Sequence, residues 1–418
     1  MAKAGSAGSF THRAVIFPAN QTALAFCRSL GPRGVPVDAL ATDPASPAQY
    51  SRYARGLRCP DPKSAEVDFI DFLIVLAGKQ QSPPLLFCSD DRSLLLFEKY
   101  RFLLEKFYLL SFPAWECVGK ILLKDSLYLQ GPDGISTPAT IHLSSLEEVA
   151  KVTSLMDFPL LLKPTLRCLR EGGEINSPPF EKVFGQKAVR VRNRAELARR
   201  FQELKERRFS VLAQEEIPGG VERLYTLAIY AGRDGRIKAA WTGRKLAQEP
   251  ADFGDALVVE AEWRPELLSL GKRVVRATGL YGIADLEFKH DPRDGQYKLL
   301  DINPRPWAWI GFPTLCGVNL PYAAYCDLTG TEVPLFRQTA NRGMRWVSPR
   351  GLLISLIRSL WKREPWGRTL KLLSHLKELR ASSRFGANDF LVRMFLSPAY
   401  WWEFFRQAKR NMPTLRPQ

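Results

Sequence analysis

The chain has 418 residues, of which 45% are hydrophobic and 25% charged, and its 60 Lys and Arg against 43 Asp and Glu give a formal net charge of +17. This balance excludes a disordered or fibrous chain and indicates a globular protein of two or three domains. Seven cysteines without a C-x-x-C pair and four histidines without ligand spacing argue against a disulfide framework, a zinc knuckle and histidine-based catalysis. We also expect no signal peptide and no spanning helix, and therefore a cytoplasmic location.

A strand–helix rhythm runs through the first 120 residues. Short apolar runs predict strands over 13–17, 35–40, 84–87 and 108–110. Apolar residues at helical spacing predict helices over 22–30, 69–77 and 94–107. This alternation is typical of a parallel α/β sheet, whose ligand sites gather at the carboxyl ends of the strands, here near 88–91. We predict a Rossmann-like domain over 11–120, and without G-x-G-x-x-G nothing in it indicates dinucleotide binding.

The middle of the chain predicts a different arrangement. Helices are expected over 122–131, 145–152, 193–206, 263–277 and 318–329. The second of these begins with a capping box made by Ser145 and Glu148. Strands are expected over 159–163, 187–191, 211–216, 223–230, 237–243 and 256–260. The last three strands are expected to pair antiparallel, which makes this part of the chain α+β.

The segment 282–309 carries the most information. Two apolar runs flank a charged turn that contains Gly, which predicts a β-hairpin. Because side chains alternate along a strand, pairing through this turn brings Glu287 near Asp301 and Asn303. Two carboxylates and an amide oxygen make the hard oxygen site that Mg²⁺ prefers, usually with phosphate oxygens completing the shell. Arg305 shares the face of Asp301 and Asn303, so its planar fork would lie at the rim, where it can grip a phosphoryl or carboxylate group.

The hairpin resembles the metal-binding end of ATP-grasp ligases, in which a strand acid is followed by E-x-N-P-R. The chain reads D-I-N-P-R at 301–305, and further motifs stand in family order over roughly 115–335. A group of predicted carboxylate–amine ligases shares with it Q-K-A-x-R-V, G-R-K-L and L-L-D/E-I-N-P-R-P-W. The resemblance implies a Rossmann-like pre-ATP-grasp domain over 11–120, ATP-grasp lobes over 121–220 and 221–335, and a helical C-terminal extension over 336–418.

The same resemblance implies roles for individual side chains. ATP would be bound, through its phosphates, adenine and ribose, by Lys124, Lys163, Lys187, Gln214, Glu215, Glu216, Ile217 and Glu222. Mg²⁺ or Mn²⁺ would be held by Glu287, Asp301 and Asn303. The catalytic charges that face the transferring group would be Arg305, Lys245 and Arg244.

These parts predict an ATP-dependent ligase that joins a small-molecule carboxylate to an amine through an acyl phosphate. A carboxylate is a poor acyl donor until ATP converts it, and fixed cations beside a metal ion stabilise the charge of the transferred group. Two alternatives without catalysis stay open. The first is a degenerate ATP-grasp module that binds nucleotide or an anionic polymer, and it rests on Asp301 in place of the usual Glu and on a loop after Lys163 with only two glycines, Gly172 and Gly173. The second is a peripheral-membrane scaffold.

The end of the chain is strongly basic. Residues 343–418 hold fifteen Lys or Arg and four Asp or Glu, a net charge of +11, together with five of the ten tryptophans. Amphipathic helices are expected over 351–362 and 398–410. Three interpretations are open: helices that pack on the core and expose a basic face, contact with an anionic membrane surface, or contact with nucleic acid. Of the two outside partners, the membrane suits basic helices with Trp at their margins better.

Overall fold

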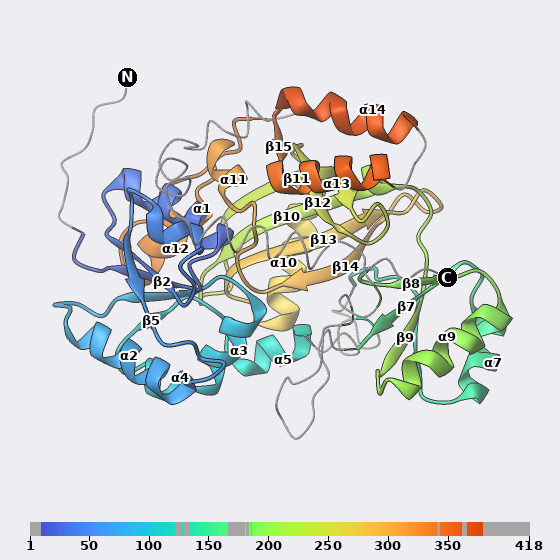
Figure 1. Ribbon diagram of the computed structural model, residues 1–418, viewed down its shortest axis with the longest axis horizontal. Coiled ribbons are helices and arrows are strands. Elements are labelled where there is room, and N and C mark those ends of the chain that lie inside the picture. The colour runs from blue at the N-terminus through green and yellow to red at the C-terminus, as the bar shows by residue number, and fades with distance from the viewer. Residues whose placement is uncertain are drawn as a thin grey trace. The chain divides into compact units, whose positions relative to one another are not determined.

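Figure 1 shows the computed structural model of the chain. It describes residues 10–122, 128, 134–165, 180, 184, 186–340, 343–361 and 366–378. Four expectations fall wholly or largely outside the described residues: those for Lys124, for the helix over 122–131, for the loop with Gly172 and Gly173, and for the helix over 398–410. The described residues form two compact units. The first joins the residues up to Phe112 with Arg305–Arg337, and the second joins Pro113–Pro304 with the described residues from Gln338 on.

The first unit contains a parallel sheet of five strands in the order β3-β2-β1-β4-β5. Its strands are β1 (Ala14–Phe17), β2 (Val37–Ala41), β3 (Arg55–Arg58), β4 (Leu85–Cys88) and β5 (Leu109–Leu110). Its first helices are α1 (Gln21–Leu30), α2 (Glu66–Gly78), α3 (Asp91–Lys99) and α4 (Arg101–Leu104). The parallel α/β arrangement predicted from the strand–helix rhythm is confirmed. The single helix expected over 94–107 is instead two helices, because the chain leaves the helical conformation at Tyr100.

Strand β3 is the one strand of this sheet that the sequence did not predict. It reads R-G-L-R and its side chains are mostly exposed, so it lacks the apolar run by which the other strands were recognised. The place of β3 at the edge of the sheet is explained by Asp38, a fully buried carboxylate on β2. Arg13 donates to Asp38 at 3.0 and 2.8 Å, and Arg55 on β3 donates to it at 2.9 and 2.8 Å. A buried charge needs such partners, so two bidentate ion pairs tie β3 to the sheet.

We expect Asp38→Asn to lower the free energy of unfolding by about 2 kcal/mol. This is less than the roughly 3–5 kcal/mol for breaking a fully buried pair, because both arginines reach solvent. Urea-induced unfolding measures the loss, and Asp61→Asn in an exposed turn is the control. A variant as stable as the parent chain would show that the two ion pairs contribute nothing to the sheet.

The segment Arg305–Arg337 packs with the first unit, whereas its sequence motifs had assigned it to the second ATP-grasp lobe. It carries α11 (Gly311–Leu315) and α12 (Leu320–Leu328). The Ser29 hydroxyl on α1 lies 3.1 Å from that of Thr314, and Asn319 donates to the carbonyl of Ser29 at 2.8 Å. These buried polar contacts, which sequence periodicity does not reveal, account for the difference.

The second unit begins with α5 (Trp115–Leu122), which lies before the helix expected over 122–131. A small lobe follows, with an antiparallel sheet in the order β6-β9-β7-β8. Its elements are β6 (Thr140–Leu143), α7 (Leu146–Leu155), β7 (Leu160–Pro164), β8 (Val189–Val191), α9 (Arg194–Glu206) and β9 (Val211–Glu215). Helices α7 and α9 cover one face of the sheet (Figure 1). The predicted capping box of Ser145 and Glu148 is confirmed at the start of α7.

A large antiparallel sheet completes the second unit, in the order β14-β13-β10-β11-β12-β15. Its strands are β10 (Leu224–Ala231), β11 (Ile237–Glu249), β12 (Asp255–Ala261), β13 (Gly282–His290), β14 (Tyr297–Asn303) and β15 (Arg345–Val347). Helix α10 (Pro265–Thr278) packs its apolar stripe on one face. The antiparallel pairing predicted for β10, β11 and β12, and the β13–β14 hairpin, are confirmed. Because α10 covers one face, the other face is free to line a site.

The described part of the basic extension lies on the second unit. Strand β15 adds to the edge of β12, and α13 (Pro349–Trp361) and α14 (Trp366–Ser374) follow it. Leu352 and Leu372 join the buried cluster that includes Leu257 and Val347. These two helices therefore pack on the core, as one of the three interpretations of this segment expects.

Candidate active site

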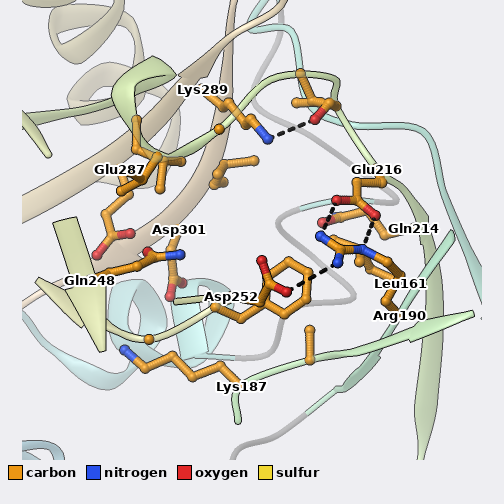
Figure 2. Close-up of a pocket in the computed structure, with 18 of the residues that line it drawn as sticks. Leu161, Lys187, Arg190, Gln214, Glu216, Gln248, Asp252, Glu287, Lys289 and Asp301 are labelled. Carbon is orange, nitrogen blue, oxygen red and sulfur yellow. Dashed lines mark hydrogen bonds and ion pairs between the residues drawn. The ribbon is translucent and has the colours of Figure 1, made fainter. Parts of the chain in front are cut away.

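A pocket opens between the small lobe and the large sheet (Figure 2). Strands β7, β8 and β9 supply one wall, and β11, β13 and β14 supply the other. The pocket brings together most of the side chains that the sequence singled out: Lys163, Lys187, Gln214, Glu215, Glu216, Ile217, Lys245, Glu287 and Asp301. Figure 2 shows Gln214 and Glu216 at one end and Lys187, Glu287 and Asp301 at the other.

Lys163 and Gln214 occupy the wall made by the small lobe. Leu160 and Leu162 on β7 enter the lobe's apolar core, so the alternate residues Leu161 and Lys163 point to the pocket. Lys163 Nζ donates to Gln214 Oε1 at 2.6 Å, and the Gln214 amide donates onward to Thr140 at 2.9 Å. The ammonium of Lys163 is thereby held at a fixed place on the wall, where an anionic ligand can take over from the amide.

The segment after β9 is anchored by charged contacts. Arg190 on β8 donates to both oxygens of Glu216 at 2.6 Å each, and to Asp252 at 3.1 Å (Figure 2). These acids raise the pKa of Arg190 above its ordinary value. Lys289 on β13 donates to the carbonyl of Ile217 at 2.6 Å, and burial lowers its pKa. Both walls of the pocket therefore meet at 216–217.

Glu215 ties the small lobe to the β13–β14 turn. Its carboxylate accepts hydrogen bonds from the Ala139 amide at 2.9 Å, from Arg293 at 2.7 Å and from Lys298 at 3.2 Å. Burial alone would raise the pKa of Glu215, but these donors hold it below its ordinary value. Its carboxylate is thus saturated by the protein, and the role the structure supports for it is to fix the pocket wall.

Acidic and basic side chains alternate at the other end of the pocket. The register of the hairpin places Glu287 opposite Asp301, and Asp285 opposite Asn303. Lys245 on β11, only 5% exposed, donates to Glu287 Oε2 at 2.9 Å. Lys187 donates to Asp255 at 2.7 Å.

The electrostatics of this end favour ionised groups. Burial alone would raise the pKa of Glu287, but the charges of Lys245 and Lys187 lower it below its ordinary value. Burial opposes the charge of Lys245 in turn, but Glu287 raises its pKa above the ordinary value. The Glu287 carboxylate, held ionised next to the second acid Asp301, can accept a divalent cation when a phosphate chain arrives with it.

The donor set at this end fits Mg²⁺ or Mn²⁺ in its chemistry. Glu287 and Asp301 are hard oxygen ligands on adjacent strands, and Asn303 is next in register on β14. Within the part of the chain that the structure describes, no three His, Cys, Asp or Glu side chains are grouped to hold a metal ion. The protein would therefore supply a partial shell, to be completed by phosphate oxygens and water, as is usual for Mg²⁺.

Comparisons with known proteins agree with this architecture. Residues 233–348 match the model of a family described as ATP-grasp in the biosynthetic pathway with Ter operon. A D-aspartate ligase from Enterococcus faecium (strain Aus0004) is 25% identical over 295 residues, which cover 68% of this chain and 68% of that protein. Over these residues the chain is similar to ATP-grasp ligases.

Solved ATP-grasp structures share the fold at low sequence identity. The N5-carboxyaminoimidazole synthetase from Staphylococcus aureus, complexed with ADP, is similar with a TM-score of 0.63 and 13% identity, over 86% of this chain and 87% of that one. The L-amino acid ligase from Bacillus licheniformis has a TM-score of 0.55 and 16% identity, over 77% and 75% of the two chains. At this sequence identity the similarity shows the fold alone and does not identify the substrates.

Four of the described residues expected at the site do not line the pocket, and Arg305 is one of them. Arg244 lies on the opposite face of β11 from Lys245, because neighbours on a strand point to opposite sides, and it pairs with Glu260 at 3.0 Å. Asn303 lies two residues beyond Asp301, opposite Asp285. Glu222 accepts a hydrogen bond from the Gly220 amide at 3.1 Å.

Arg305 belongs to the first unit. Its guanidinium makes a bidentate ion pair with Asp91, the first residue of α3, at 2.7 and 2.9 Å. Asp91 follows the carboxyl end of β4, the edge at which ligand sites of parallel sheets gather. The arginine of the D-I-N-P-R motif is thus oriented by an acid 214 residues earlier in the chain.

Sequence reasoning assigned no site role to four residues with prominent contacts. Arg190 stands in the Q-K-A-x-R-V motif, and Lys289 shares the face of Glu287 by strand alternation, so both had a sequence signal. Asp91 stands in the strand end near 88–91, where ligand sites were expected, although its partner Arg305 could not be foreseen. Asp252 had no signal, because its importance comes from a partner far away in the chain.

Proposed function

We propose that the chain is an ATP-dependent carboxylate–amine ligase that forms an amide or peptide-type bond. The observation that carries the proposal is a single pocket lined by Lys163, Lys187 and Lys245 together with the acid pair Glu287 and Asp301. Such a pocket suits a polyphosphate with its divalent cation. The D-aspartate ligase relative and the L-amino acid ligase with the same fold support ligation as the reaction.

The chemistry we propose proceeds in two steps. A substrate carboxylate oxygen attacks the γ-phosphorus of ATP and ADP leaves, which forms an acyl phosphate. The amine nitrogen then attacks the acyl carbon, loses a proton, and expels phosphate. The net reaction joins acid and amine and converts one ATP to ADP and phosphate. No protein nucleophile takes part, in line with the lack of a Ser/His/Asp or Cys/His arrangement in the sequence.

The residues of the chain would bind and orient the reactants. Lys163 and Lys187 would hold phosphate oxygens and exchange their present partners, Gln214 and Asp255, for them. Lys245 would place a buried positive charge where the transferring group becomes most negative. Mg²⁺ or Mn²⁺, held by Glu287 and Asp301, would neutralise charge on the phosphates.

An ADP-release assay tests the proposal. The purified chain is incubated with ATP, Mg²⁺, hydroxylamine as a surrogate amine, and pools of amino acids, peptides or sugar acids. We expect ADP release, with formation of a hydroxamate, for a restricted set of acids. Nucleotide binding without ADP release in every pool would instead favour the alternative of a degenerate ATP-grasp module without catalysis.

We expect Asp91→Ala to impair the reaction by releasing Arg305. The bidentate pair fixes the direction of the guanidinium, and a misplaced charge typically costs about 10²-fold in rate. The measurement is kcat and KM for the acid, with KM for ATP as a second readout, and Asp91→Glu should restore part of the loss. A rise confined to the KM for ATP would contradict this role, since it would place the pair at the nucleotide.

The expected cytoplasmic location and the contact of 343–418 with a membrane or a nucleic acid stay predictions. The residues of the described pocket lie outside 343–418, so the proposed reaction does not depend on either partner.

A further inference from the structure

Helices α13 and α14 carry large apolar residues on more than the side that packs on the core. Leu352 and Leu372 are buried in the core, and so are the small polar residues Ser355, Ser359 and Thr369. The hydroxyls of Ser359 and Thr369 lie 2.7 Å apart between the helices, and Ser355 donates to Glu249 at 2.9 Å. A surface helix of a globular protein usually keeps its apolar residues on the inward stripe, so further large apolar residues on the exposed side are unusual.

The exposed side of these helices is a row of aliphatic side chains. Leu353, Ile357 and Leu360 follow each other at the spacing of one helical face on α13. On α14 and the short turn after it, the exposed large aliphatic residues are Leu370, Leu373 and Leu376. All six are between 42% and 60% exposed. We call these six residues the aliphatic face. Scattered single leucines on a surface need no explanation, but a cluster of this kind marks an interaction site.

Charge indicates what covers the aliphatic face. Residues 343–418, the segment that contains it, carry a net charge of +11. A second copy of the chain would bring the same positive charge against it, which disfavours self-association. An anionic lipid surface offers both an apolar layer for the leucines and negative headgroups for the Lys and Arg.

Insertion across the bilayer is not indicated. Among the described helices none has the length and apolarity to cross a membrane. A pair of helices that exposes aliphatic side chains and belongs to a basic segment is instead suited to lie in the plane of the membrane–water interface.

We propose that the aliphatic face of α13 and α14 docks the protein on an anionic membrane surface. The proposal does not depend on the ligase reaction. It places the protein next to a lipid surface whatever its pocket binds.

Co-sedimentation with vesicles tests this docking. The full-length chain is mixed with vesicles of phosphatidylcholine alone, or of phosphatidylcholine with an equal part of phosphatidylglycerol. We expect binding to the anionic vesicles that weakens as salt is added, and little binding to the neutral ones. The variant Leu353→Ser/Ile357→Ser/Leu360→Ser should bind the anionic vesicles at least about tenfold more weakly, since it loses apolar burial at three positions.

A matched control separates docking from a general loss of surface hydrophobicity. Leu146→Ser/Leu155→Ser changes two equally exposed leucines on α7 and should bind as the parent chain does. Thermal unfolding of each variant checks the fold, which exposed substitutions should leave intact. If the triple variant unfolds early, salt dependence and the lipid preference of the parent chain still decide the question.

Several outcomes would overturn the proposal. One is that the full-length chain binds no anionic vesicles, in which case residues 379–418 or another protein cover the aliphatic face. Another is equal vesicle binding by the parent chain and a folded triple variant. A third is self-association of the parent chain that the triple variant abolishes, and a fourth is tight binding to RNA with none to vesicles.

Discussion

Glu287→Gln is expected to lower Mg²⁺-dependent ATP turnover at least about a thousandfold, the upper range for losing one preorganised electrostatic group in an active site. Glu287 is one of the two pocket acids paired across β13 and β14, and its pKa is lowered, so it offers a charged ligand at neutral pH. The amide of Gln keeps the shape of the side chain but removes the charge that a divalent cation needs. Initial rates over a Mg²⁺ titration, together with Kd for Mg²⁺–ATP, measure the effect.

The same sheet supplies a matched control for that experiment. Glu260 on β12 is buried and ion-paired like Glu287, but its partners, Arg244 and Arg345, lie on the face that turns away from the pocket. Glu260→Gln should therefore lower stability and leave turnover near that of the parent chain. If Glu287→Gln retains turnover, or if both variants lose it equally, Glu287 is not a metal ligand.

Lys245→Met is expected to make the free energy of unfolding fall as pH rises through neutrality. In the parent chain the pKa of Glu287 is lowered, so its ion pair with Lys245 stabilises the fold at pH values above about 4.3, the ordinary pKa of a Glu carboxyl group. This contribution is lost as pH falls. The raised pKa of Lys245 makes it stabilising below about pH 10.4, and this contribution is lost as pH rises further. Between these two pH limits the contribution of the pair to stability is constant, and this range includes neutral pH.

The variant leaves the Glu287 carboxylate without the ammonium that now lies 2.9 Å from it. Burial then dominates and we expect the pKa of Glu287 to rise, so the folded state binds a proton more tightly than the unfolded state. Stability should then fall as pH rises through neutrality, with a loss of about 3 kcal/mol at pH 8, as for a buried pair deprived of one partner. Urea-induced unfolding at pH 5 and pH 8 measures both the loss and its sign.

Two comparisons make this experiment decisive. Added Mg²⁺ should restore part of the stability of Lys245→Met, because a cation that binds only the folded state stabilises it by mass action. Lys238→Met is the control, since Lys238 lies outside the pocket, its partner Asp234 is 45% exposed and such surface pairs are worth less than about 1 kcal/mol. A Lys245→Met variant whose stability stays level between pH 5 and pH 8, as expected of the parent chain, would mean that Glu287 finds another cation.

The sequence alone determined the features that depend on local periodicity and on motif order. Alternation placed Glu287 and Asp301 across from each other on a hairpin, and the register confirms this pairing. The apolar run around Leu160 identified a strand whose last lysine faces the pocket. Both predictions needed only the period of a strand, which any short stretch of sequence reveals.

The tertiary structure alone decided which charged side chains meet. Arg305 and Asp91 pair across 214 residues, and Arg244 turns to Glu260 although its neighbour Lys245 faces the pocket. It also decided that α13 buries Leu352 and exposes Leu353 and Leu360, because that depends on which face the large sheet covers. Local sequence states what a residue is and how it alternates with its neighbours. The partner of a charge and the covered side of a helix follow from packing between distant segments, and no local pattern encodes them.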